Sequence, residues 1–157
     1  MIILGLDPGS RRIGYGIIEE TGSKTSLVDA GLLPIQSSND PEALAETEKQ
    51  YRKLLAKHNP QLVGIEKLFF MKNRTTGIAV SQARGVLLAT TVSNDIPLIE
   101  LTPNQVKQGL TGYGGADKNS IMKMVRIILH EPNLKLIDDA MDALAIALVS
   151  SRYHKIS

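Results

Sequence analysis

The stretch LGLDPGSRRIGYG, near the start of the chain, limits the possible folds more than any other feature. Its apolar residues predict a buried strand over 2–6, and Pro8 and Gly9 then turn the chain. The strand therefore ends in one carboxylate, Asp7. Three interpretations of this side chain are open: it caps the turn, it belongs to the phosphate-binding loop of an ATPase, or it binds a metal ion.

The segments after this turn predict an α/β domain with a mixed five-stranded sheet flanked by helices. Two strands, over 12–18 and 25–33, are expected to form an antiparallel hairpin on one side of the sheet, with βαβ units on the other. The later predicted elements are a helix that Asp40 caps and Pro41 begins, a short strand that ends at Glu66, a long helix over 74–93, a strand over IPLIE, a helix that Thr102 caps before Pro103, a helix over 119–130 and a last helix that begins near Asp138.

The composition excludes several classes of protein. A length of 157 residues predicts one domain, 1–157, with a sizeable core. The absence of Cys excludes a disulfide framework and thiolate chemistry, and it suits a cytoplasmic location. The N-terminus has the pattern of a strand rather than of a signal peptide. The longest apolar run, 143–149, is too short to span a membrane, so no membrane association is expected.

Charge is unevenly distributed along the chain, although the net charge is only +2. A basic middle between two slightly acidic ends favours a polyanionic partner. Basic side chains that merely solvate helix faces would explain the same pattern equally well. Residues 67–130 hold three acidic side chains and eight basic ones, namely Lys67, Lys72, Arg74, Arg84, Lys107, Lys118, Lys123 and Arg126.

Four carboxylates occupy positions from which a fold of this kind could bring them together. Asp7 and Glu66 each end an apolar strand, while Asp139 and Asp142 lie three residues apart on one face of the last helix. Asp138, four residues before Asp142, is a rival for the upper position on that helix. Asp142 is the hardest to explain in other ways, because the residues that follow it, ALAIALV, are nearly all apolar.

Each acid alone has a simpler interpretation: a turn residue for Asp7, the sheet edge for Glu66, and helix capping for Asp138 and Asp139. Together they indicate a metal site, because two like charges about 4 Å apart repel by roughly 4 kcal/mol at an effective dielectric of 20. Oxygen ligands without His or Cys suit Mg²⁺, or Mn²⁺ in its place. Two such ions would activate a water and stabilise the leaving oxygen of a phosphodiester.

The only two phenylalanines of the chain, Phe69 and Phe70, are adjacent and lie just after a predicted strand end. Because alternate side chains of an extended segment point to opposite sides, one of them is expected to be exposed. An exposed ring beside Lys72 and Arg74 suits base stacking with neutralisation of phosphate charge. Packing of both rings under a loop is the alternative.

The chain resembles the RuvC family of Holliday-junction resolvases over essentially its whole length. The matching segments are GLDPGSRRIGYG, IEKLFFMKN, QARGV, QVKQ with the following glycine loop and ADK, and DDAMDALAIAL. DPG alone is weak evidence, but all five segments in this order and spacing are highly specific. The resemblance implies a ribonuclease H-like fold, a homodimer, and symmetric nicking of two opposing strands of a four-way junction, beside the branch-migration proteins RuvA and RuvB.

The resemblance also implies the catalytic set. Asp7, Glu66, Asp139 and Asp142 match the metal-binding carboxylates, and the expected cofactor is two Mg²⁺ ions in each site. Asp139 is preferred over Asp138 because the family pattern has an Asp, two further residues and then Asp-Ala. Two basic residues match catalytic positions near the scissile phosphate, Lys107 and Lys118.

Phe69 matches an aromatic residue that stacks on an unpaired base of the junction. Lys67 departs from the Gln of many relatives, and Phe70 with Met71 makes the loop bulkier, so base contacts and sequence preference are open to change. The full set of residues expected to bind DNA is Phe69, Lys72, Asn73, Arg74, Arg84, Lys107 and Lys118.

Three other functions are compatible with parts of the pattern. A ribonuclease H-like nuclease that trims RNA precursors shares the opening motif. A sugar-kinase or actin-like ATPase would need two such domains around its nucleotide, whereas the length here suits one. A non-catalytic junction-binding module would have a broken acidic set, and here the set is whole.

Overall fold

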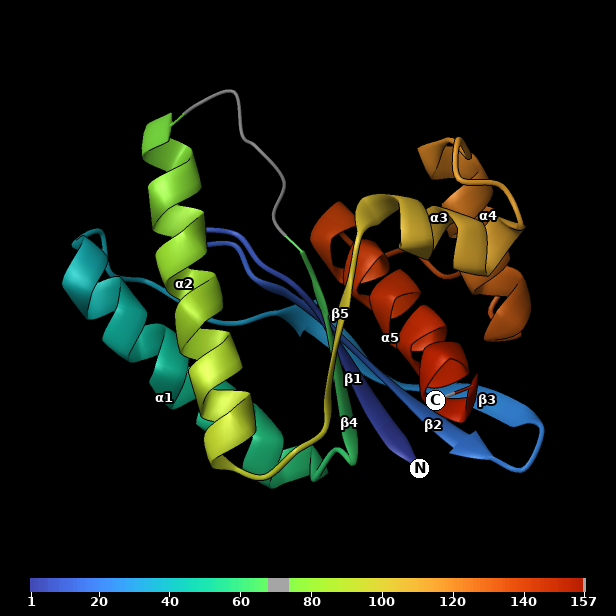
Figure 1. The fold of residues 1–157 in the computed structure, drawn as a ribbon, viewed down its shortest axis with the longest axis horizontal. Coiled ribbons are helices and arrows are strands. Elements are labelled where there is room, and N and C mark those ends of the chain that lie inside the picture. The colour runs from blue at the N-terminus through green and yellow to red at the C-terminus, as the bar shows by residue number, and fades with distance from the viewer. Residues whose placement is uncertain (68–73, 157) are drawn as a thin grey trace.

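The computed structural model describes residues 1–67 and 74–156, and Figure 1 shows the arrangement of their helices and strands. The elements follow one another as β1 (Ile2–Asp7), β2 (Gly14–Thr21), β3 (Lys24–Leu32), α1 (Asp40–His58), β4 (Leu62–Glu66), α2 (Arg74–Ser93), β5 (Leu98–Leu101), α3 (Pro103–Thr111), α4 (Lys118–Ile128) and α5 (Asp138–Ile156).

The five strands form one mixed sheet in the order β3-β2-β1-β4-β5. The pairs β1–β2 and β2–β3 are antiparallel, as expected for strands joined by tight turns. The pairs β1–β4 and β4–β5 are parallel, because helical crossovers connect them. The predicted mixed sheet, with hairpin strands on one side and βαβ units on the other, is thereby confirmed.

Helices cover both faces of the sheet. Helices α1 and α2 lie on one face, and α5 crosses the other face with α3 and α4 packed beside it (Figure 1). Strand side chains alternate between the two cores: Ile3 and Leu62 belong to the core under α5, whereas Leu4, Leu6 and Val63 belong to the core under α1 and α2. The sheet is thus buried on both sides, which explains why its central strands are almost wholly apolar.

Several element boundaries differ from the sequence prediction by one or two residues. The second strand begins at Gly14 rather than at 12, and Gly14 pairs with Asp7, the last residue of β1. The N-cap of α1 is Asn39, and Asp40 is the first helical residue. Helix α4 ends at Ile128 rather than at 130, because His130 has a positive φ of 57° that a helix cannot continue through.

The predicted cap of α3 is confirmed. The Thr102 side chain accepts a hydrogen bond from the backbone N–H of Gln105, and the Gln105 side chain accepts one from the backbone N–H of Thr102. This reciprocal capping box, with Pro103 in the first turn, places the start of α3 directly after β5. Among the helices of the described chain, none has the length and hydropathy needed to cross a bilayer.

Candidate active site at the carboxyl ends of β1 and β4

Asp7 and Glu66 end two neighbouring parallel strands and lie side by side. Leu6 pairs with Ile65 in the register of β1 and β4, so the next residue of each strand is the acid. Alternation along the strands then directs Asp7 to the same face as Ile3, and Glu66 to the same face as Leu62. Both carboxylates therefore project toward the face that α5 covers.

Glycines in the two strands allow α5 to approach these carboxylates closely. A Cβ on Gly5 would overlap the backbone of Ala143, and a Cβ on Gly64 would overlap the side chain of Ser150. Each glycine stands two residues before its acid, in the repeated pattern glycine–apolar–acid of LGLD and VGIE. That repetition is a signal in the sequence that our reasoning from single residues missed.

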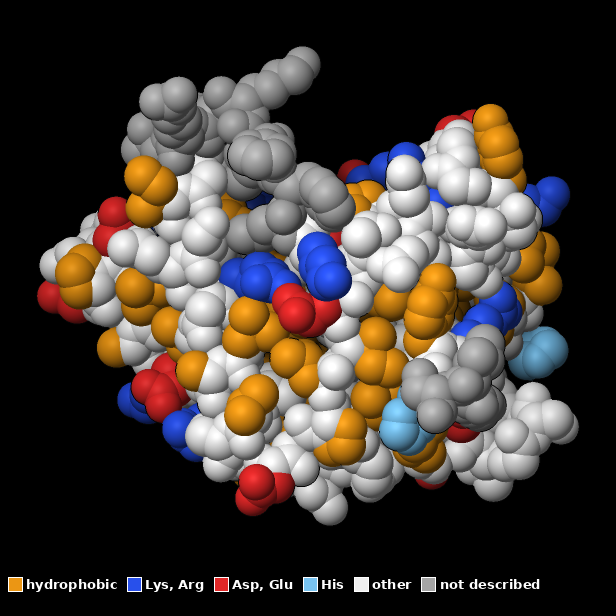
Figure 2. All heavy atoms as spheres, in the orientation of Figure 1, with side chains coloured by type: hydrophobic (Ala, Val, Ile, Leu, Met, Phe, Trp, Pro, Cys, Tyr) orange, Lys and Arg blue, Asp and Glu red, His pale blue; other side chains and the backbone are white. Residues whose placement is uncertain are grey.

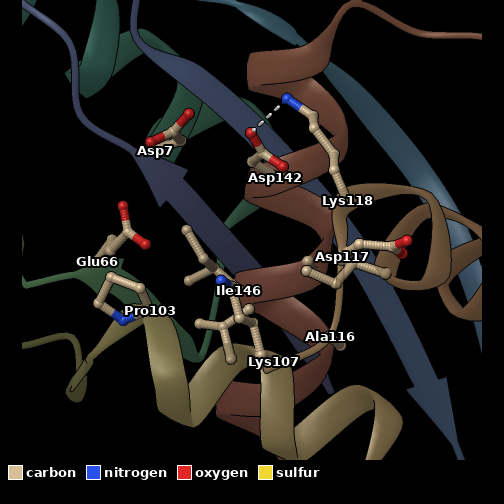
Figure 3. A pocket seen from close by; sticks show the side chains of 12 residues that line it. Asp7, Glu66, Pro103, Lys107, Ala116, Asp117, Lys118, Asp142 and Ile146 are labelled. Carbon is tan, nitrogen blue, oxygen red and sulfur yellow. Dashed lines mark hydrogen bonds and ion pairs between the residues drawn. The ribbon is translucent and has the colours of Figure 1, made fainter. Parts of the chain in front are cut away.

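Asp142 projects from α5 into the same space as Asp7 and Glu66 (Figure 3). The three carboxylates line a cleft of about 260 Å³. Two lysines, from α3 and from the start of α4, also line the cleft. The remaining walls are Pro103, Val106, Ala116, Asp117, Ile121, Ala145 and Ile146.

The three cleft carboxylates resist ionisation. Burial raises the pKa of Asp7 to about 7, and the nearby charges of Glu66, Asp142 and Asp139 add to the shift. Burial also raises the pKa of Glu66, and so does the charge of Asp142. The pKa of Asp142 is raised by burial as well, although the ammonium group of Lys118 opposes that shift.

Two lysines provide positive charge at this cluster. The Lys118 Nζ lies 3.0 Å from Asp138 Oδ2 and 3.5 Å from Asp142 Oδ2, and its contact with Asp142 is visible in Figure 3. The hydrogen bond to Asp138 raises the pKa of Lys118, so the group stays protonated. Lys107 lines the opposite part of the cleft and lowers the pKa of Glu66.

Asp139 and Asp138 are held by basic side chains at the rim of the cleft. Asp139 Oδ2 accepts hydrogen bonds from Arg12 Nε at 3.0 Å and from Arg12 Nη2 at 2.7 Å. Asp139 is not among the residues that line the cleft, but its charge acts on both Asp7 and Asp142. Arg12 could not be predicted as the partner of Asp139 from local sequence patterns, because 127 residues separate the two.

The predicted DNA-binding residues divide into those that the structure places and those that it does not describe. Phe69, Lys72 and Asn73 lie outside the described residues, as does the side chain of Arg74. Arg84 on α2 has only 15% of its side chain exposed, and it binds protein groups on β4 and β5.

The donor set of the cleft fits a hard divalent cation. Three partly buried carboxylates with raised pKa values repel one another, and a bound cation would remove that repulsion. Among residues 1–67 and 74–156, no three acidic or imidazole side chains are yet gathered closely enough to form a metal site.

The fold and these carboxylates define the class of protein first. A mixed sheet in this order, crossed by a helix that brings acids to the ends of its two central parallel strands, is the ribonuclease H-like fold. A family model described as crossover junction endodeoxyribonuclease RuvC matches residues 3–150. The chain therefore belongs to the RuvC family, as its motifs indicated.

Individual relatives agree with this assignment. The chain is 39% identical to a crossover junction endodeoxyribonuclease RuvC of Petrotoga mobilis, over 99% of this chain and 96% of the relative. It is 44% identical to one of a Roseiflexus species, over 92% and 87% of the two chains. It is also similar to Thermus thermophilus RuvC in complex with a Holliday junction substrate, with a TM-score of 0.89, 28% identity, and coverage of 99% and 96%.

Proposed function

We propose that this protein resolves four-way DNA junctions by hydrolysing one phosphodiester bond in each of two opposing strands, in recombination and repair of DNA. The observation that carries the proposal is the cleft in which Asp7, Glu66 and Asp142 meet beside two lysines. Membership of the RuvC family supports the same reaction, and so does the likeness to a relative studied with a Holliday junction substrate. The described fold is consistent with action as one domain, 1–157.

The acids would hold Mg²⁺, because nucleases of the RuvC family are metal-dependent and the cleft offers only oxygen ligands. Asp7, Glu66 and Asp142 are the ligands proposed from the cleft, and Asp139 joins them once it leaves Arg12. Two ions bound there, or Mn²⁺ in their place, would supply an activated water and stabilise the leaving oxygen.

The lysines of the cleft act on the substrate and on the acids. Lys118 and Lys107 neutralise part of the charge of the scissile phosphate, which lets the phosphodiester approach a cluster of carboxylates. Lys118 also lowers the pKa of Asp142 and so favours the ionised form that binds a cation. We infer that Phe69, Lys72, Asn73 and Arg74 contact the junction DNA, since an aromatic ring beside basic side chains suits base stacking with neutralisation of phosphate charge.

Symmetric nicks need two active sites, and we propose that a homodimer provides them. An outward face of α2 supports this proposal: Ile78 and Val92 are 61% and 62% exposed, and small or short side chains lie between them. Figure 2 shows hydrophobic side chains at the surface over this helix. RuvA and RuvB are the partners implied by the family, and the cytoplasm is the location that they imply.

The test is cleavage of an end-labelled four-way junction in Mg²⁺, read on a denaturing gel. Linear duplex of the same sequence and linear RNA are run beside it. Paired nicks at symmetric positions, with duplex and RNA intact and with Asp142→Asn inactive, are expected. Cleavage of the RNA alone, or an equal rate on linear duplex, would contradict the proposal.

A mobile junction that can place many sequences at its centre would also reveal the preferred cleavage sequence. The Phe69→Ala variant belongs in the same series. Because stacking on an unpaired base would stabilise the opened junction, that variant is expected to lose cleavage more than binding.

A further inference from the structure

We propose that Arg84 positions Glu66 for the reaction by holding the carboxyl ends of β4 and β5 together. This inference rests on the proposed function, and it departs from the DNA-binding role that was expected for Arg84 from the sequence. Arg84 would act by holding the backbone of Glu66 in place, and it would not contact the substrate.

The contacts of Arg84 join three elements at one point. Its Nε donates a hydrogen bond to the backbone oxygen of Glu66 at 3.0 Å, and its Nη2 forms a charged hydrogen bond with Glu100 on β5. The planar guanidinium suits two acceptors in a fixed relation, which a lysine ammonium does not reproduce. One side chain of α2 thereby links the last residue of β4 to β5.

Little of the Arg84 side chain remains available for a phosphate. Only 15% of it is exposed, compared with 39% for Glu100. A phosphate contact would have to replace the Glu100 contact and leave that carboxylate without its partner. Arg84 therefore differs from Lys107 and Lys118, which line the cleft itself.

The hydrogen bond from Arg84 supports the backbone of Glu66 at the point where strand β4 ends. Glu66 pairs with Leu101, and the N–H of Lys67 donates to the Leu101 oxygen at 2.7 Å. Strand β4 ends at Glu66, and strand β5 ends at Leu101. The direction of the Glu66 carboxylate follows from the orientation of its backbone, and a misplacement of about 1 Å at a reacting group can cost about a hundredfold in rate.

The experiment compares Arg84→Met with Arg84→Lys and Glu100→Gln. Arg84→Met is expected to cut a saturated junction about 10- to 100-fold more slowly, while the Kd for the junction, measured without Mg²⁺, changes less than threefold. Titration with Mn²⁺, followed by the EPR signal of the free ion, is expected to show weakened metal binding. Arg84→Lys should recover part of the rate, and Glu100→Gln should lose rate in the same direction but less.

Arg52→Met is the matched control. It removes the same charge from an exposed arginine–glutamate pair on α1, a helix with no residue in the lining of the cleft, so rate and Kd should both stay at the wild-type value. Thermal unfolding of every variant identifies those that are folded at the assay temperature. If Arg84→Met does not fold, Glu100→Gln carries the test with the same expected direction.

Two results would overturn the inference. A weaker Kd with an unchanged rate at saturation would make Arg84 a DNA contact, and an unchanged rate with an unchanged Kd would deny it any role. Failure of the proposed function is distinguishable, because the wild-type protein would then not cut the junction in the same assay.

Discussion

The acids on the strands and the acids on α5 face the same region but differ in their surroundings. In the described part of the chain, neither Asp7 nor Glu66 forms an ion pair, and burial raises the pKa of both. On α5, Asp138 and Asp142 contact Lys118, and Asp139 contacts Arg12. Two cations of the protein thus offset part of the charge of the three helix acids, whereas the charge on the strands is left for another cation.

This difference has a structural cause. The backbone of β1 at the centre of the sheet is fixed by pairing with β2 and β4, and Asp7 points toward the face that α5 covers. The acids of α5 begin a helix at the rim, where Arg12 and Lys118 can reach them. We infer that the strand acids form the rigid half of the site and that the helix acids form its adjustable half.

The largest effect is expected from loss of a strand acid. Asp7→Asn should lower single-turnover cleavage by about a thousandfold or more, because it removes a ligand from a site whose ions supply most of the catalysis. Glu66→Gln should behave alike, and gel-shift affinity for the junction should be retained. Asp138→Asn, which removes an exposed acid paired with Lys118, is the control and should stay within a few-fold of wild type. Equal losses of cleavage rate in Asp7→Asn and Asp138→Asn would contradict the proposed difference between the strand acids and the helix acids.

The next largest effect is the change that Asp7→Asn causes in the free energy of unfolding when no metal is bound. The pKa of Asp7 is about 7 in the folded protein and 3.8 in the unfolded chain, so ionisation destabilises the fold progressively between these values and fully above pH 7. At pH 8 without metal, Asp7→Asn should therefore raise the free energy of unfolding by roughly 2–4 kcal/mol. At pH 4 the gain should nearly vanish.

Urea titrations at the two pH values measure this gain. Mg²⁺ should stabilise the wild-type protein more at pH 8 than at pH 5, since the ion binds the ionised carboxylates. An equal gain from Asp7→Asn at pH 4 and pH 8 would show that ionisation of Asp7 is not the cause.

A smaller effect on cleavage is expected from loss of Lys118, the lysine that contacts the acids of α5. Lys118→Met removes the ammonium group that lowers the pKa of Asp142, so that pKa should rise further. Cleavage at pH 6 should then fall about tenfold relative to wild type, and the loss should shrink at higher pH. Lys123→Met, an exposed lysine of the same helix, is the control. A loss independent of pH would assign Lys118 to the phosphate alone.

The smallest effect concerns Arg12. Exposed ion pairs contribute about 0.2–1 kcal/mol, so Arg12→Gln should release Asp139 and tighten Mn²⁺ binding by only about two- to fivefold, as measured by calorimetry. Arg11→Gln removes the same charge from the neighbouring residue, which pairs with Asp40 instead, and corrects for the general effect of charge. Identical affinities in the two variants would indicate that Asp139 is not a ligand.

The fold class, the order of the elements and the family could all be predicted from the amino-acid sequence. Alternation of apolar residues, the caps at Thr102 and Pro103, and the acid at each strand end are local patterns, and local patterns survive in any tertiary arrangement. Asp7, Glu66 and Asp142 could be identified as candidate site residues for the same reason. Each is a charged residue next to an apolar run, and that pattern is visible without coordinates.

The side-chain contacts between residues that are distant in the sequence could be identified only from the tertiary structure. The Arg12 contact with Asp139, the Lys118 contact with Asp138 and the Arg84 contact with Glu66 join different elements. Such pairs depend on the register of β1 with β4 and on how closely α5 approaches the strand glycines. Register and approach are set by packing of the whole core, so no local pattern encodes them.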